Sequence, residues 1–190
     1  MPLPLSPTTA EQQTLDEIRD WHDSLVEALL DRRAAVQHAI LTGATVAPRF
    51  VGMTEADVES HYDADREELD RLTILNLVAS AEASIMDDYF RRIRGRLKDP
   101  LARAYQVSHK GLSSRDQLRP PFDGRPRSVL WTLDETKLVN NHVIREYREC
   151  RPARHWFGHG RNWDKPTAVD RFDPEDVFVR AIALLTAMPA

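Results

Sequence analysis

Apolar residues recur at three- and four-residue steps along most of the chain, which is the spacing that predicts amphipathic helices. The first such stretch covers residues 9–41, and a second, longer one covers residues 55–98. Gly43 to Gly52, a segment that includes Pro48, interrupts the pattern between them. Thr54, with Asp57 three residues later, is a typical N-cap for the second helix. We expect this second helix to form the centre of the fold.

The C-terminal half is expected to contain shorter elements. Asp99-Pro100 predicts the start of a short helix, because proline is favoured at the first helical position. Residues 109–126 are rich in Gly, Ser, Pro and Arg and predict a long basic loop. The same spacing rule predicts a further helix that begins near Thr132 or Asp134 and runs to Cys150, over residues 132–150.

Helix boundaries follow from local signals. Thr132 and Glu135 have the spacing of a capping box at the start of the 132–150 helix. Pro152 should kink or restart that helix, and the new segment should continue to about residue 163. Asp173-Pro174, followed by two acidic residues, predicts the start of the last helix.

About five helices and no clear strand predict an all-α helical bundle. The chain has 190 residues, enough for one domain with a sizeable core. Residues 1–8 contain three prolines and are expected to form a disordered tail, and residues 9–190 a single α-helical domain.

Composition narrows the class of protein. An apolar content of 42% and a charged content of 29% are those of a soluble globular protein. No segment approaches the ~20 apolar residues of a membrane span, and the N-terminus lacks the features of a signal peptide. We therefore expect a cytoplasmic protein that does not contact a membrane. Its one cysteine, Cys150, excludes an intrachain disulfide and a cysteine-rich zinc site, and it is expected to be a buried apolar residue.

The formal net charge is -4, so the whole molecule is not a general binder of polyanions. Any contact with nucleic acid must use a local basic patch. Residues 91–98 contain such a run of Arg and Lys at the end of the long helix. This run either complements the negative end of the helix dipole or contacts a phosphate backbone.

The most informative segment is 154–163, which contains two His, two Arg and two Trp in ten residues. On a helix, His155 and His159 lie on one face, and Arg151 and Asn162 extend that face. The neighbouring apolar stripe consists of Ala153, Trp156, Gly160 and Trp163. One face can therefore pack while a polar edge remains available to a ligand.

Arg154 and His159 have the spacing Arg-x4-His and suit chemistry on phosphate esters. Arginine binds an anion through a planar fork of donors, and histidine transfers protons near neutral pH. This spacing is common by chance. The structural alternative is a helix with a solvated basic edge and two tryptophans in the core.

Segment 154–163, followed by 173–178 (DPEDVF), resembles the RiboL-PSP branch of the HEPN domains. Members of that branch have motifs similar to RHWxAHGRYW, followed by YDPxDVY. Glu82-Ala83 and segment 98–103 (KDPLAR) also look like this branch, so the resemblance covers about residues 70–190. Two departures, Phe157-Gly158 in place of an aliphatic residue and Ala, and Asn162 in place of Tyr, alter the shape expected for the pocket.

The resemblance implies an α-helical, usually dimeric domain, and many of its members are ribonucleases that need no metal or other cofactor. They act in toxin–antitoxin, phage-defence or RNA-processing settings, so RNA, a second copy and an antitoxin or other protein are the implied partners. By the same resemblance, Arg154, His159 and His155 are the predicted catalytic residues, with His155 as the polar neighbour of Arg154. Arg151, Arg161 and Asn162 are predicted to bind substrate. Residues 70–190 form the HEPN-like core, and residues 9–69 form a helical extension.

Such a site would cleave RNA by attack of the 2′-OH on the neighbouring phosphate, giving a 2′,3′-cyclic phosphate. A histidine moves the proton, and Arg154 stabilises the charge of the transition state. Two motifs facing each other across a twofold axis would provide an acid and a base together, which favours a homodimer.

Two alternatives remain open. The first is a non-catalytic helical module that binds RNA, a nucleotide or a partner. The second is a zinc site at His155 and His159 with Asp164. Trp156 stands where a metalloprotease would have its glutamate.

Other ionisable residues are weaker candidates. A carboxylate on the central helix, Glu82 or Asp88, could orient a motif side chain or form a local ion pair with Arg91 or Arg92. The remaining histidines are expected to be structural or surface residues: His22, His38, His61, His109 and His142.

Overall fold

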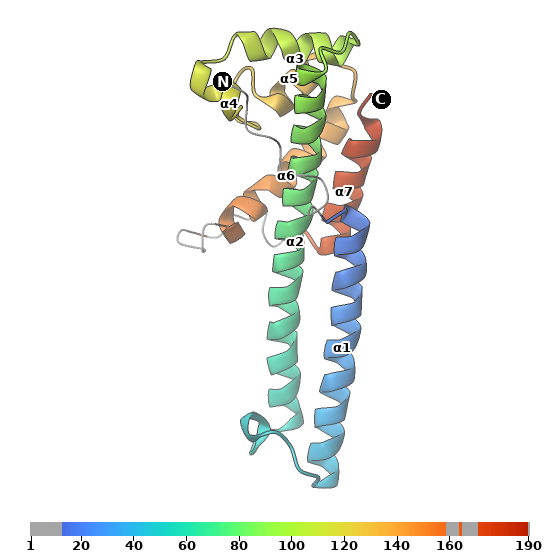
Figure 1. Cartoon of the computed structure of the whole chain (residues 1–190). Helices are drawn as coiled ribbons and strands as arrows, with labels where there is room; N and C mark the ends of the chain where they lie inside the picture. Colours follow the sequence, from blue (N-terminus) through green and yellow to red (C-terminus); the bar gives the residue numbers. More distant parts are fainter. Residues whose placement is uncertain (1–12, 159–163, 165–170, 190) are drawn as a thin grey trace.

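The computed structural model describes residues 13–158, 164 and 171–189, and every regular element in these ranges is a helix. The all-α fold class is thus confirmed. In chain order the elements are α1 (Leu15–Thr42), the 3-10 helix η2 (Pro48–Phe50), α2 (Glu55–Arg94), α3 (Pro100–Lys110), α4 (Ser114–Leu118), α5 (Val129–Glu135), α6 (Asn141–Gly158) and α7 (Pro174–Ala187). Helices α1 and α2 form a long antiparallel hairpin, and α3, α4 and α5 lie at the end opposite its tip (Figure 1).

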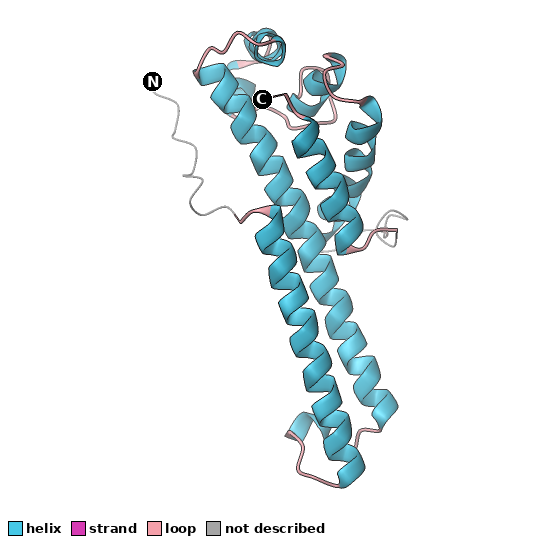
Figure 2. Cartoon of the chain, turned by 90° about the vertical axis from the view of Figure 1, so that its right-hand side faces the viewer, coloured by secondary structure: helices cyan, strands magenta, loops and turns pink. Residues whose placement is uncertain are grey.

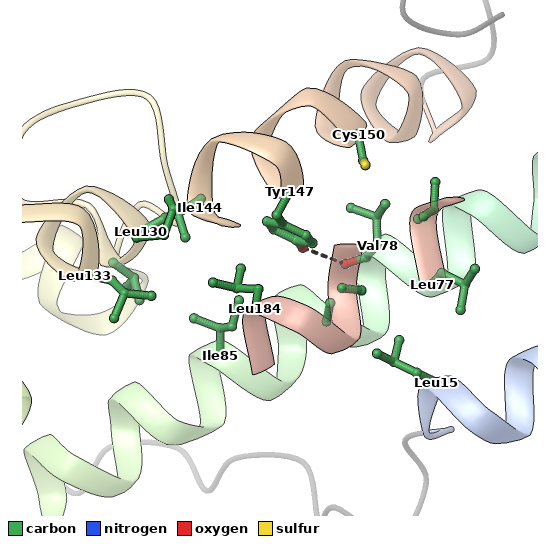
Figure 3. Close-up of a cluster of buried hydrophobic side chains, with 14 of the residues drawn as sticks. Leu15, Leu77, Val78, Ile85, Leu130, Leu133, Ile144, Tyr147, Cys150 and Leu184 are labelled. Carbon is green, nitrogen blue, oxygen red and sulfur yellow. Dashed lines mark hydrogen bonds between the residues drawn. The ribbon is translucent and has the colours of Figure 1, made fainter. Parts of the chain in front are cut away.

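Helix α2 is the centre of the main core. Its buried residues recur at helical spacing through Ile74, Leu77, Val78, Ala81, Ile85 and Tyr89. The start of α1 packs against this stripe together with α6 and α7 (Figure 3). Tyr147 of α6 donates a hydrogen bond from its hydroxyl to the Val78 carbonyl at 3.2 Å. Burial of apolar area along α2 thus fixes the positions of three other helices.

A second, smaller core lies at the tip of the α1–α2 hairpin, which extends well beyond α7 (Figure 2). It consists of the buried residues Val36, Phe50, Val58 and Tyr62. The chain turns there at Gly43, whose φ of 70° is in the left-handed region that favours glycine. We call residues 23–70, the part of the hairpin that includes this tip, the arm.

The predicted helix starts at Thr54, Asp99 and Asp173 are confirmed. Each side chain accepts a hydrogen bond from a backbone N–H in the first turn, and Thr54 with Asp57 forms a complete capping box. Predicted disorder in residues 1–8 lies outside the described residues. The predicted start of the HEPN-like core, at residue 70, falls inside α2, which is continuous there.

The single helix predicted over 132–150 is wrong, because the chain forms α5 and α6 with a break between them. The capping box predicted at Thr132 is also wrong. Thr132 lies inside α5, and its hydroxyl is hydrogen-bonded to that of Ser108 at 2.8 Å in the core. The Thr132 side chain therefore makes a tertiary contact in the core instead of the helix cap that its spacing to Glu135 predicted.

Of the kink or restart predicted at Pro152, the restart does not occur, since α6 runs through it from Asn141 to Gly158. Proline removes one intrahelical hydrogen bond. Burial of Ala153 and Trp156 in the main core, one and four residues later, stabilises the helix beyond this point.

The predicted loop 109–126 contains the five-residue helix α4, which begins after the N-cap Ser113. Seven α-helices in the described ranges therefore replace the five that were expected. Both additional helices, α4 and α5, are too short for periodicity to reveal. No helix in the same ranges is both long enough and apolar enough to span a membrane.

The basic run 91–98 contains one structural arginine. The side chain of Arg92 is only 1% exposed, and its guanidinium donates to Asp88 and Asp99, both at 2.7 Å, and to the Pro189 carbonyl. Desolvation acts to raise the pKa of Asp99, but the Ala102 N–H and the Arg92 charge hold it below its ordinary value. Arg92 thus joins α2, the start of α3 and the C-terminal segment.

We expect Arg92→Ala to lower the free energy of unfolding by about 3–5 kcal/mol, because it leaves two carboxylates without their buried partner. Chemical denaturation would measure the loss. The control is Arg91→Ala, since Arg91 also pairs with Asp88 but is 62% exposed, and it should cost less than about 1 kcal/mol. Equal losses for the two variants would contradict a structural role specific to Arg92.

Candidate functional site

Helix α6 presents arginines along one polar edge. Tyr147, Cys150, Ala153 and Trp156 are buried at three-residue steps and fix the rotation of the helix. Arg148, Arg151 and Arg154 each follow one of these positions, so they fall on the edge beside the buried stripe. All three are part-exposed.

The arginines of this edge alternate with three carboxylates from other elements. We call this row the charge ladder, and its members in order are Asp134, Arg148, Asp123, Arg151, Glu82 and Arg154. Arg148 lies 2.6 Å from Asp134 and 3.3 Å from Asp123, and Arg151 lies 2.9 Å from Asp123. The ladder ties α5, the loop before it and α2 to α6.

Glu82 of α2 is shared by the last two arginines. Its Oε1 accepts from Arg151 Nε at 3.0 Å, and its Oε2 lies 3.6 Å from Arg154 Nη2. Its side chain is only 15% exposed. The central helix therefore holds the motif arginine by a carboxylate, which is one of the two roles predicted for Glu82 and Asp88. Asp88 has the other role, because it pairs with Arg91 and Arg92.

Arg154 is the member with the most exposed side chain among the three arginines, at 37%. Its Nε is buried and has no hydrogen-bond partner among the described residues. A buried donor without a partner is uncommon in folded proteins. Glu82 holds one side of the guanidinium, and because Nε is inaccessible to solvent, an anion would bind at the Nη groups of this part-exposed side chain.

Arg151, which was predicted to bind substrate, makes contacts within the chain that position a loop. Its guanidinium contacts both Glu82 and Asp123, and its Cζ lies 5.0 Å from the centre of the Phe122 ring, within the range of a cation–π contact. These contacts fix the loop that contains Phe122 and Asp123 against α6.

The remaining predicted site residues are only partly placed. His155 is an exposed residue of α6 beside Arg154. His159, Arg161 and Asn162 lie outside the described residues, so the pairing of Arg154 with His159 remains a prediction. Asp164, named for the alternative zinc site, is described and exposed. Within the described ranges no group of three or more His, Cys, Asp or Glu is arranged to hold a metal ion.

Two carboxylates of the ladder, Asp123 and Asp134, were missed by sequence reasoning. Asp123 lies in an irregular segment where no periodicity applies, and both carboxylates come close to α6 only in the folded chain.

The positions of these two carboxylates determine the electrostatics of the ladder. Desolvation acts to lower the pKa of Arg148, but hydrogen bonds and charge from Asp134 and Asp123 raise it above the ordinary value.

Other predicted residues have structural roles. Cys150 is buried in the main core, which confirms its prediction as a buried apolar residue, and burial raises the pKa of its thiol to about 12. His22 contacts Asp70 at 2.7 Å, and His109 contacts the Tyr89 hydroxyl at 2.8 Å. Glycine is not required at position 158, where a Cβ would meet the Leu75 side chain at 3.6 Å, an ordinary contact.

Comparison with known proteins finds no matching family model, no matching curated protein and no matching solved structure. The resemblance to the HEPN domains therefore rests on the sequence motifs alone.

We expect Glu82→Gln to lower the free energy of unfolding by about 1–2 kcal/mol, because it removes the carboxylate between two part-buried guanidinium groups. Urea denaturation would measure it. Glu67→Gln is the matched control on the same helix, since Glu67 pairs with Arg71 at 2.7 Å but is 70% exposed, and it should cost less than about 0.5 kcal/mol. A Glu82 variant as stable as the control would show that the part of the ladder formed by Glu82 adds nothing to folding.

Proposed function

We propose that the protein is a metal-independent endoribonuclease of the HEPN type. The proposal rests on the position, contacts and exposure of the Arg154 side chain. It lies at the polar edge of α6, beside His155 and five residues before His159, with one side of its guanidinium held by Glu82 and part of it exposed. A cation fixed before substrate binds can stabilise developing negative charge without reorganisation.

The chemistry needs proton transfer and charge stabilisation. A base removes the proton of the 2′-OH, and the resulting O2′ attacks the neighbouring phosphorus. The bond from phosphorus to O5′ breaks, and an acid donates a proton to that oxygen. The products are a 2′,3′-cyclic phosphate and a 5′-OH end. We assign one proton transfer to His159 and charge stabilisation to Arg154, with His155 as its polar neighbour.

A second copy of the chain would complete this site. One motif contains one strong arginine and one or two histidines, whereas the reaction uses an acid and a base on opposite sides of the phosphate. Two α6 helices related by a twofold axis would supply both. The resemblance also implies a toxin, phage-defence or RNA-processing setting, in which an antitoxin or another protein is a partner, and composition favours the cytoplasm as its location.

We expect the purified protein to cleave RNA in the presence of EDTA and to leave 2′,3′-cyclic phosphate ends. Arg154→Ala and His159→Ala should each lower the cleavage rate at least ~100-fold, the scale of losing a transition-state donor or an acid–base group. A gel assay with end-group analysis would measure both the rate and the product.

The controls separate chemistry from folding. His155→Ala should have a milder effect, and all three variants should retain the circular dichroism spectrum and melt within about 4 °C of the unchanged protein. Cleavage only with added divalent metal would contradict the mechanism. RNA binding without cleavage would favour the non-catalytic binding module instead.

We also expect a homodimer whose twofold axis passes near α6. Solution mass from light scattering would give the stoichiometry, and crosslinking through cysteines introduced at exposed positions of α6 would locate the axis. A monomer at the concentrations of the cleavage assay, or a dimer joined only through the arm, would rule out the composite site.

A further inference from the structure

Charge is divided unevenly between the two ends of the molecule. Residues 91–127 contain eleven Lys and Arg against three Asp and Glu, which gives a net charge of +8. The arm, residues 23–70, contains eleven Asp and Glu against four Arg, which gives -7. We call residues 91–127 the basic cap. The overall charge of -4 thus conceals a strongly basic region.

The positive charge of the basic cap is at its surface. Of the eleven cationic residues only Arg92 is buried, and the exposed ones are Arg91, Arg94, Arg96, Lys98, Arg103, Lys110, Arg115, Arg119, Arg125 and Arg127. The three carboxylates are each held in ion pairs. Asp99 pairs with Arg92, Asp116 with Arg125, and Asp123 with two arginines of the charge ladder.

The basic cap lies at the end of the molecule opposite the arm and continues into the candidate site. Its α3 and α4 are at the far end of α2 from the hairpin tip (Figure 1). The loop after α4 then reaches α6, where Phe122 and Asp123 contact Arg151, one helical turn from Arg154. The exposed Arg119 and Arg125 flank these two residues in the chain, so positive side chains extend from α3 and α4 towards the ladder.

We propose that the basic cap binds the phosphate backbone of RNA and leads the strand to Arg154. The identity of the polyanion as RNA rests on the proposed function. Eight of the ten exposed cations are arginines, whose planar forks suit phosphate oxygens. The acidic arm repels a polyanion, so the field of the molecule orients the basic cap towards it.

The test is binding of a fluorescent single-stranded RNA of mixed sequence to the full chain, measured by anisotropy over a series of salt concentrations. All proteins carry His159→Ala to prevent cleavage. The cap variant adds R103Q, K110Q and R115Q, three exposed residues of α3 and α4. Arg125 and Arg127 are kept because they bind Asp116 and the Gly111 carbonyl.

The matched control adds R32Q, R49Q and R66Q, three exposed arginines of the arm, and changes the net charge equally. At about 0.1 M salt we expect the cap variant to bind RNA about 100-fold more weakly, with the salt slope reduced by about 2, since each lost phosphate contact removes about 0.7 from that slope for a single strand. The control should bind within about threefold of its parent. If the triple cap variant fails to fold, R103Q and K110Q alone should each reduce the slope by about 0.7.

Several results would overturn the inference. They are absence of RNA binding by the parent, equal losses in the cap and arm variants, and binding of polyglutamate as tightly as RNA. If the cap variant binds RNA normally but no longer associates with other copies of the chain, the basic cap binds the acidic arm of a second molecule and not RNA. Failure of the proposed function is distinguishable, because a protein without nuclease activity can still show cap-dependent RNA binding.

Discussion

The unbroken helicity of α2 is the constraint on which the rest of the structure depends. One apolar stripe of this helix packs in the main core. The N-terminal part of the same helix contributes Val58 and Tyr62 to the small core of the arm. The same helix supplies Glu82 to the motif arginine and Asp88 to the buried Arg92. A change in its rotation would therefore disturb packing, the charge ladder and the attachment of α3 together.

Features that depend on near neighbours could be predicted from the sequence. The caps at Thr54, Asp99 and Asp173 involve residues three apart, and the burial of Trp156 and Cys150 follows from helical spacing. Elements decided by distant contacts could not. Thr132 bonds to Ser108 instead of capping a helix, and the core holds α6 together across its proline.

The candidate site divides in the same way. Spacing alone places Arg151, Arg154 and His155 along one part of α6, and resemblance assigns Arg154 its role. Asp123 and Asp134 contact the arginines only because a loop and α5 fold back on α6, and no sequence pattern predicts these contacts. Composition also misleads for the run 91–98, where Arg92 is a core residue and the other four cations are at the surface.

The separation of the two cores has a consequence for how the molecule opens. Four residues form the centre of the arm's core, whereas the main core buries side chains from six of the helices. Backbone amides near Gly43 and Val58 should therefore exchange with solvent through local opening events that leave the amides near Ile85 protected. The arm and the body then form two cooperative units on one continuous helix, and the distal part of the arm can unfold and refold while the charge ladder remains intact.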